Sequence, residues 1–227
     1  MSFSGALLRF DPVPVGNNPL PGLFGPIPPW AAEVDGALTE YMEFSNEIAN
    51  SSIEGLAARD LSDITMVTRA DFLSGESALG GDAVNDYASR AADNEYIQTA
   101  FQSRIESLDL SADCPQDDPF TTDSALRRAT MLSCAGCHAP TRFLGEERKI
   151  GCGLTWPASH GEVHIDEKGD LSPALREVFL PRRAAVLETY LQACDEEAIL
   201  DAFGGSPEDG FSVKSGSRRT LGGRSTH

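Results

Sequence analysis

The chain has 227 residues, of which 41% are hydrophobic, so it can bury the core of one or two domains. Its formal net charge of −17 repels phosphate backbones and anionic lipid headgroups, which argues against nucleic acid and membrane surfaces as partners. No stretch of the sequence approaches the roughly 20 apolar residues that span a bilayer, so we expect no membrane span.

Residues 1–30 are rich in proline and glycine, with seven prolines between positions 12 and 29. Proline fixes its own backbone angle and removes a hydrogen-bond donor, so we expect an extended strap that lies on a partner surface rather than a regular helix. Residues 1–9 carry no basic cluster and few apolar side chains, and they do not resemble a signal peptide.

Residues 31–119 are predicted to form a layer of helices. Apolar side chains recur at helical spacing over residues 30–59, where the polar run at 50–52 indicates a break between two helices. A further helix is expected over residues 86–108, because its apolar residues repeat every three or four positions. The segment 113–119, with its prolines and aspartates, is predicted to be a linker that ends the layer.

Residues 120–203 are predicted to form a second helical unit that carries a Cys-x-x-Cys-His motif. A helix over 124–137, capped by Thr122 or Asp123, would present this motif at its C-terminal end. A long segment with little periodicity follows, and it includes a possible short strand at 162–166.

The end of the chain is predicted to contain two short helices and a tail. Ser172 and Pro173 suit the cap and the first position of a helix, and Pro181 is expected to end it before a second helix over 182–194. Glycine, serine and arginine dominate residues 204–227, which we expect to be disordered. The predicted fold class is mainly α, with long irregular loops and at most a short β hairpin.

The motif comprises Cys134, Cys137 and His138, separated by Ala135 and Gly136. Two thiols three positions apart on one helical turn can reach the two vinyl groups on one edge of a porphyrin, and the histidine that follows places its imidazole under the iron. The small intervening residues would leave room for the macrocycle against the backbone. The motif therefore predicts one covalently bound haem c with His138 as a metal ligand, and residues 120–203 as a helical haem c domain.

The run of residues 132–138, Leu-Ser-Cys-Ala-Gly-Cys-His, resembles the single-haem c-type cytochromes. Residues 10–195 more loosely resemble the C-terminal region of exported bacterial proteins that carry one such motif. The resemblance implies an electron-transfer protein rather than an enzyme, as the redox module of a larger exported protein with an unidentified redox partner. It also implies an extracytoplasmic location, with an export signal that lies outside this chain.

In the c-type cytochromes that this run resembles, the second axial ligand is usually a methionine downstream of the motif. This chain has no methionine after the motif; its four methionines are Met1, Met42, Met66 and Met131. We predict His164, because Val163 and Ile165 on either side would hold it in an apolar pocket on a strand. His160 is the alternative. Two histidine ligands favour electron transfer at a lower potential than His/Met ligation, whereas an open position would permit small-ligand binding or peroxidase-like activity.

Zinc is the competing interpretation of the same cluster. Cys134, Cys137 and Cys152, with His160 or His164, could supply the four tetrahedral ligands of a structural zinc site in an interaction domain. Cys152 has no neighbouring cysteine or histidine at the spacing that most structural zinc sites use, however. We therefore treat zinc as the alternative and haem as the main prediction.

Haem attachment would leave Cys114, Cys152 and Cys194, which allow one disulfide. A disulfide between Cys152 and Cys194 is one possibility, and a disulfide that uses Cys114 and so holds the linker is another. Buried free thiols are the third possibility. Trp156 could line the haem or belong to an ordinary core. The arginine pair at 182–183 could bind haem propionates or lie on the surface.

Overall fold

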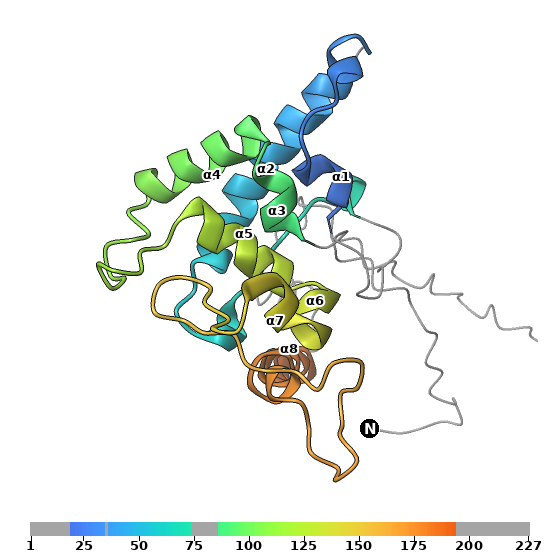
Figure 1. Ribbon diagram of the computed structural model, residues 1–227, viewed down its shortest axis with the longest axis vertical. Helices are drawn as coiled ribbons and strands as arrows, with labels where there is room; N and C mark the ends of the chain where they lie inside the picture. The colour runs from blue at the N-terminus through green and yellow to red at the C-terminus, as the bar shows by residue number, and fades with distance from the viewer. Residues whose placement is uncertain (1–18, 35, 74–85, 194–227) are drawn as a thin grey trace, which may run out of the picture.

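The computed structural model describes residues 19–34, 36–73 and 86–193 (Figure 1). Within these ranges the chain is helical with long irregular connections, and its extended pairing is limited to four isolated β-bridges. The predicted mainly α fold is confirmed. The predicted tail at 204–227, most of the predicted strap and Cys194 lie outside the described ranges.

The described end of the proline-rich segment is helical rather than extended. It forms α1 (Pro21–Phe24) and the 3-10 turn η1 (Pro29–Ala32), each with proline at its start, where the missing N–H costs no helical hydrogen bond. Phe24 is fully buried, and its ring stacks on that of Tyr87 at 4.3 Å between centroids. For these residues the prediction of an extended strap is wrong, because an apolar side chain anchors the segment in the core.

Helix α2 (Ala37–Leu56) runs without a break through residues 50–52. The Ser51 hydroxyl oxygen lies 2.9 Å from the carbonyl oxygens of both Glu47 and Val67, so its single hydrogen is shared between them. The serines therefore tie the helix to the segment that follows it instead of interrupting it, which corrects the predicted break. The face of α2 toward the core carries Phe44, Ile48, Ala49, Ile53 and Leu56.

The single helix predicted over 86–108 is two helices, α3 (Tyr87–Ala91) and α4 (Glu95–Ser107). Asn94 separates them: its side-chain oxygen accepts from the first backbone N–H groups of α4, and its amide donates to the carbonyls of Leu23, Phe24 and Gly25. Asn94 is only 1% exposed. A buried asparagine cap thus ends the helical repeat where apolar periodicity alone predicts continuation.

Helix α5 (Thr122–Met131) lies at the centre of the molecule, against α2, α3 and α4 (Figure 1). Its cap is Thr121, one residue before the predicted candidates. One hydrophobic core includes side chains on both sides of the predicted boundary at residue 120, such as Phe101 and Leu126. The motif that follows α5 is therefore attached to the main core of the protein.

Arg128 on α5 is fully buried and ties three segments together. Its guanidinium lies 4.9 Å from the Phe120 ring centroid, and burial lowers the pKa of Arg128 to about 10, so it stays charged at neutral pH. The guanidinium donates hydrogen bonds at 2.7–2.9 Å to four backbone carbonyls, those of Leu56, Ala58, Ile150 and Gly151. This contact fixes the loop after α7 (Pro140–Leu144) onto the core.

A disulfide joins Cys114 to Cys152 and spans 38 residues. It links the predicted linker to the same loop that Arg128 holds. Of the pairings left open by the sequence, the structure therefore shows the one that uses Cys114. Cys152 lies at a tight turn with a φ of 59°, between Gly151 and Gly153, whose φ values are 78° and 74°.

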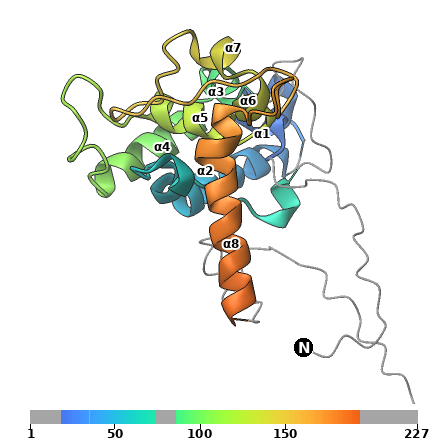
Figure 2. The ribbon, with the colours of Figure 1, turned by 90° about the horizontal axis from the view of Figure 1, so that it is seen from below.

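The C-terminal helices form one continuous rod. Ser172 caps it through a bond from the Leu175 N–H (3.3 Å), a π-helical turn η5 (Leu175–Phe179) follows, and α8 (Leu180–Ala193) continues directly. The predicted break at Pro181 is wrong. Pro181 has no backbone N–H to donate, and the wider π-helical turn η5 just before it accommodates this loss, so the helix continues. Figure 2 shows α8 extending away from the body. None of the described helices is both long and apolar enough to cross a bilayer.

Candidate functional site

The cysteine motif forms a helical turn of its own, α6 (Cys134–His138), rather than the end of the helix predicted over 124–137. The chain breaks at Ser133, which is 4% exposed. Its hydroxyl accepts a bond from the Ala135 N–H at 3.2 Å and donates to the Thr130 carbonyl at 2.6 Å. Ser133 therefore ends α5 and begins α6 at once, and it turns the motif away from the direction of α5.

The small residues inside the motif are required by packing between α5 and α6. A Cβ added at Gly136 would lie 1.8 Å from the Met131 carbonyl oxygen, so no other residue fits without movement of the backbone. Ala135 is only 1% exposed. The sequence suggested that these residues are small in order to leave room for a macrocycle. In the structure, packing against the core explains why both are small.

Trp156 supports the motif from the other side. It is fully buried, its indole N–H donates to the Gly136 carbonyl at 2.9 Å, and its ring lies edge-on to Phe179 at 6.0 Å. Trp156 thus belongs to the core, which was one of the two possibilities, and it connects α6 to η5.

The two thiols of the motif are one helical turn apart, half-buried, and not joined in a disulfide. Burial raises the pKa of the Cys137 thiol to about 11, and the nearby Arg183 guanidinium opposes the shift. Cys137 is therefore protonated at neutral pH. This is the opposite of the low thiol pKa that activates a thioredoxin-like redox pair.

His138 is oriented by the segment that wraps around α6. Its Nδ1 lies 2.8 Å from the Gly161 carbonyl oxygen. A carbonyl can only accept, so Nδ1 donates its N–H to it, and Nε2 is the nitrogen that can accept a hydrogen bond or bind a metal. The Ser159 hydroxyl donates to the His138 carbonyl at 3.1 Å and accepts from the Gly161 N–H at 3.2 Å. Metal-ligating histidines are typically held by such a second hydrogen bond.

The structure brings His164, rather than His160, to His138. The Nε2 atoms of His164 and His138 are 3.0 Å apart, and the ring centroids are 4.7 Å apart at an interplanar angle of 50°. His160 is half-buried, and its Nε2 has no hydrogen-bond partner within the described ranges. Of the two predicted candidates for the second metal ligand, His164 is therefore the one that faces the first.

The surroundings of His164 differ from the prediction. Segment 162–166 is not a strand: it has only the isolated bridges of His160 with Val163 and of Ile165 with Leu171. His164 is exposed, and Val163 and Ile165 are 50% and 55% exposed. The predicted apolar pocket is therefore absent around His164 in the described structure, because these side chains point out of the loop rather than into a core.

The distance between the two histidines does not select a metal. Metal–imidazole bonds are about 2 Å long, so the two nitrogens stand about 3.3 Å apart on a tetrahedral zinc and about 4 Å apart on opposite sides of an iron. The Nε2 atoms of His138 and His164 are 3.0 Å apart, so the exposed loop of His164 would move outward to admit either metal. For zinc, Cys152 is needed as a thiolate, but it is held in the disulfide with Cys114. The described ranges contain no cluster of three or more His, Cys, Asp or Glu side chains arranged for a metal ion.

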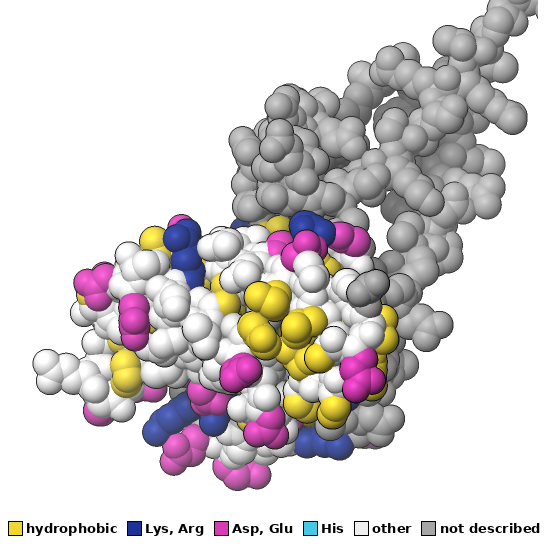
Figure 3. All heavy atoms as spheres, turned by 90° about the horizontal axis from the view of Figure 1, so that it is seen from above, with side chains coloured by type: hydrophobic (Ala, Val, Ile, Leu, Met, Phe, Trp, Pro, Cys, Tyr) yellow, Lys and Arg dark blue, Asp and Glu magenta, His cyan; other side chains and the backbone are white. Residues whose placement is uncertain are grey.

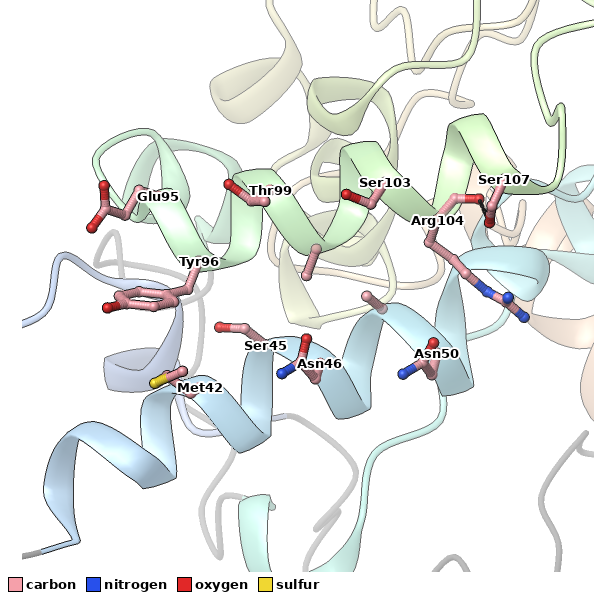
Figure 4. A pocket seen from close by; sticks show the side chains of 12 residues that line it. Met42, Ser45, Asn46, Asn50, Glu95, Tyr96, Thr99, Ser103, Arg104 and Ser107 are labelled. Atoms are coloured by element: carbon pink, nitrogen blue, oxygen red, sulfur yellow. Dashed lines mark hydrogen bonds between the residues drawn. The ribbon is translucent and has the colours of Figure 1, made fainter.

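A surface groove lies between α2 and α4, away from α6 (Figure 4). It has a volume of about 660 Å³ and mixed polar and apolar walls, with Ser45, Asn46 and Asn50 on one side and Thr99 and Ser103 on the other. The face seen in Figure 3 carries a hydrophobic patch with acidic side chains around it. Neither feature brings together residues with evident chemistry, so α6 and its wrapping segment remain the candidate site.

Reasoning from the sequence missed Ser159, Gly161 and Arg128. A serine two positions before a glycine is a common turn pattern, and Gly161 does adopt a φ of 70°. That pattern does not show which helix the turn contacts.

No family model matches this chain, and no curated protein or solved structure gives a significant match.

Proposed function

We propose that this chain binds one haem c covalently through Cys134 and Cys137, with His138 and His164 as iron ligands, and that it transfers electrons. One observation carries the proposal. The helical turn with both thiols also presents a histidine whose Nδ1 is bonded to a carbonyl and whose Nε2 faces the Nε2 of a second histidine at 3.0 Å.

Each residue would then have a defined role. Cys134 and Cys137 would hold the porphyrin edge through thioether bonds, and His138 and His164 would hold the iron. The bound haem would supply a one-electron ferric/ferrous couple. Two imidazole ligands would favour a lower potential than His/Met ligation, which suits an electron carrier rather than an enzyme. Arg183, close enough to affect the Cys137 thiol, would offset part of the propionate charge.

An extracytoplasmic location belongs to the same proposal. The Cys114–Cys152 disulfide is typical of proteins that fold in an oxidising compartment. We propose that the chain acts as the redox module of an exported protein with an as yet unidentified redox partner. Because the formal net charge is −17, a partner with a basic surface would be attracted to it.

The test is to produce the chain in a host with cytochrome c maturation and to measure its pyridine haemochrome spectrum. We expect about one iron per chain and a Soret band that stays with the protein after acid-acetone extraction, because thioether bonds hold the porphyrin. Cys134→Ala combined with Cys137→Ala should release the haem to the solvent phase. A colourless protein with one zinc per chain would refute the proposal and select the zinc domain instead.

The assignment of the second ligand is tested separately with matched variants of one loop. His164→Ala should convert a low-spin ferric spectrum to a high-spin one, because the iron loses an imidazole ligand. His160→Ala, four residues earlier, should leave the low-spin spectrum unchanged. The reverse outcome would show that His160 is the ligand and that the loop rearranges when haem binds.

A further inference from the structure

We propose that His164 is an exchangeable ligand and that a small neutral diatomic molecule, such as carbon monoxide or nitric oxide, takes its place on ferrous iron. The inference rests on the proposed haem attachment and goes beyond electron transfer, because it assigns a ligand-binding site to the face of the iron on which His164 lies. It follows from a difference in how firmly the chain holds its two facing histidines.

His138 is held at several points. It ends the helical turn α6, its Nδ1 is bonded to the Gly161 carbonyl, and its own carbonyl accepts a bond from Ser159. The turn behind it is fixed by Trp156 and by the close approach of Gly136 to Met131. His138 therefore cannot leave its position without disturbing the core.

His164 is held much more weakly. Its ring contacts that of His138, but its Nδ1 has no hydrogen-bond partner within residues 19–34, 36–73 and 86–193. Its carbonyl accepts one bond, from the Ser172 N–H at 2.8 Å. It lies in an exposed loop whose extended pairing, within the described residues, consists of the isolated bridges of His160 with Val163 and of Ile165 with Leu171. The loop extends below the helical body in Figure 1, and residues 162–165 are exposed, so their displacement would not uncover the buried core.

The difference in hydrogen bonding allows an estimate of how strongly each histidine would hold the iron. Loss of a hydrogen-bonding partner behind a metal-bound histidine typically costs about 10–100-fold in metal affinity, so His164 should dissociate far more readily than His138. If His164 is off the iron for about 1% of the time, the apparent affinity for a competing ligand falls only about 100-fold. Strong ligands of ferrous haem can tolerate such a reduction.

The charge of the loop selects neutral ligands. Segment 162–170 carries four carboxylates against the single Lys168, and all but Asp166 of these charged residues are exposed: Glu162, Asp166, Glu167, Lys168 and Asp170. The surrounding negative potential disfavours anions but not uncharged diatomic molecules. In the exchange the bond from iron to His164 would break and a bond from iron to the diatomic ligand would form, and no external oxidant or reductant is needed.

The experiment measures carbon monoxide binding to the haem-loaded full chain after reduction with dithionite. We expect the Soret band to shift to that of a carbon monoxide complex. The observed rate should level off as carbon monoxide rises, because dissociation of His164 becomes limiting. In His164→Ala the rate should stay proportional to carbon monoxide and be at least tenfold faster at the highest concentration. His160→Ala, the matched control, should keep the levelling-off of the wild type.

The outcomes separate this inference from the proposed function. If haem is bound but only His164→Ala takes up carbon monoxide, His164 is a permanent ligand and the inference is wrong while the haem assignment stands. If wild type and His164→Ala bind with equal, proportional rates, His164 does not compete at all and the inference is wrong. If no haem is attached, the proposed function fails and this inference fails with it. The concentration dependence of the wild type is decisive even if a variant does not fold.

Discussion

Replacing Gly136 with alanine should destabilise the protein, although alanine is the better helix former. Helix propensity alone predicts a gain of about 1 kcal/mol from this substitution in a helix. The new Cβ would lie 1.8 Å from the Met131 carbonyl oxygen, whereas real contacts stay beyond 3.0 Å, so α6 must move by about 1.2 Å. Steric overpacking of this kind costs about 1–3 kcal/mol.

The movement would also strain the hydrogen bond from Trp156 to the Gly136 carbonyl, and an unpaired buried polar group costs about 1–3 kcal/mol. The two costs add to about 2–6 kcal/mol, and the gain in helix propensity offsets about 1 kcal/mol. We therefore expect the free energy of unfolding to fall by about 1–5 kcal/mol, against the about 5–15 kcal/mol typical of a domain. Haem content should fall as well, because α6 presents both thiols.

Urea unfolding followed by circular dichroism measures the effect, and the haem content of each protein is measured separately so that the haem-free forms can be compared. Gly22→Ala is the matched control, because nothing lies within 4 Å of a Cβ at that position in α1, and it should change stability by less than about 1 kcal/mol. A loss below about 1 kcal/mol for Gly136→Ala, or any gain, would show that α6 shifts freely and that its contact with α5 does not fix the motif.

Three further predictions concern the core around the site. Arg128→Met should lower the unfolding free energy by about 3–5 kcal/mol, because four buried carbonyls lose their donor; unchanged urea unfolding would contradict this. Cys114→Ser combined with Cys152→Ser should cost about 4 kcal/mol, as expected for a 38-residue loop, and a reductant should then have no added effect on thermal unfolding. Tyr87→Phe should raise stability by about 1 kcal/mol, because the Tyr87 hydroxyl is buried without a partner in the described ranges; a lower melting temperature would reveal an undetected bond.

Local patterns predicted a good part of the helical structure. The apolar repeat of α4 and the cap at Ser172 were both readable, because they depend on residues within three or four positions of one another. Helix boundaries were predicted poorly where a distant partner decides them. Asn94 ends a helix because its amide reaches carbonyls some 70 positions away, and Ser51 does not end one because its hydroxyl reaches Val67.

The candidate site likewise combines features that local sequence predicts with features that depend on distant contacts. The spacing of Cys134, Cys137 and His138 is a local property, so the sequence by itself determined which residues could attach a haem and which two histidines could complete the ligand set. Only the tertiary structure decided that His164 rather than His160 faces His138, 26 positions away. That choice depends on the path of the chain around α6, which Arg128, Trp156 and the Cys114–Cys152 disulfide fix through contacts across the fold. Such contacts leave no periodic trace in the sequence, because each joins a single side chain to a backbone group or cysteine far along the chain.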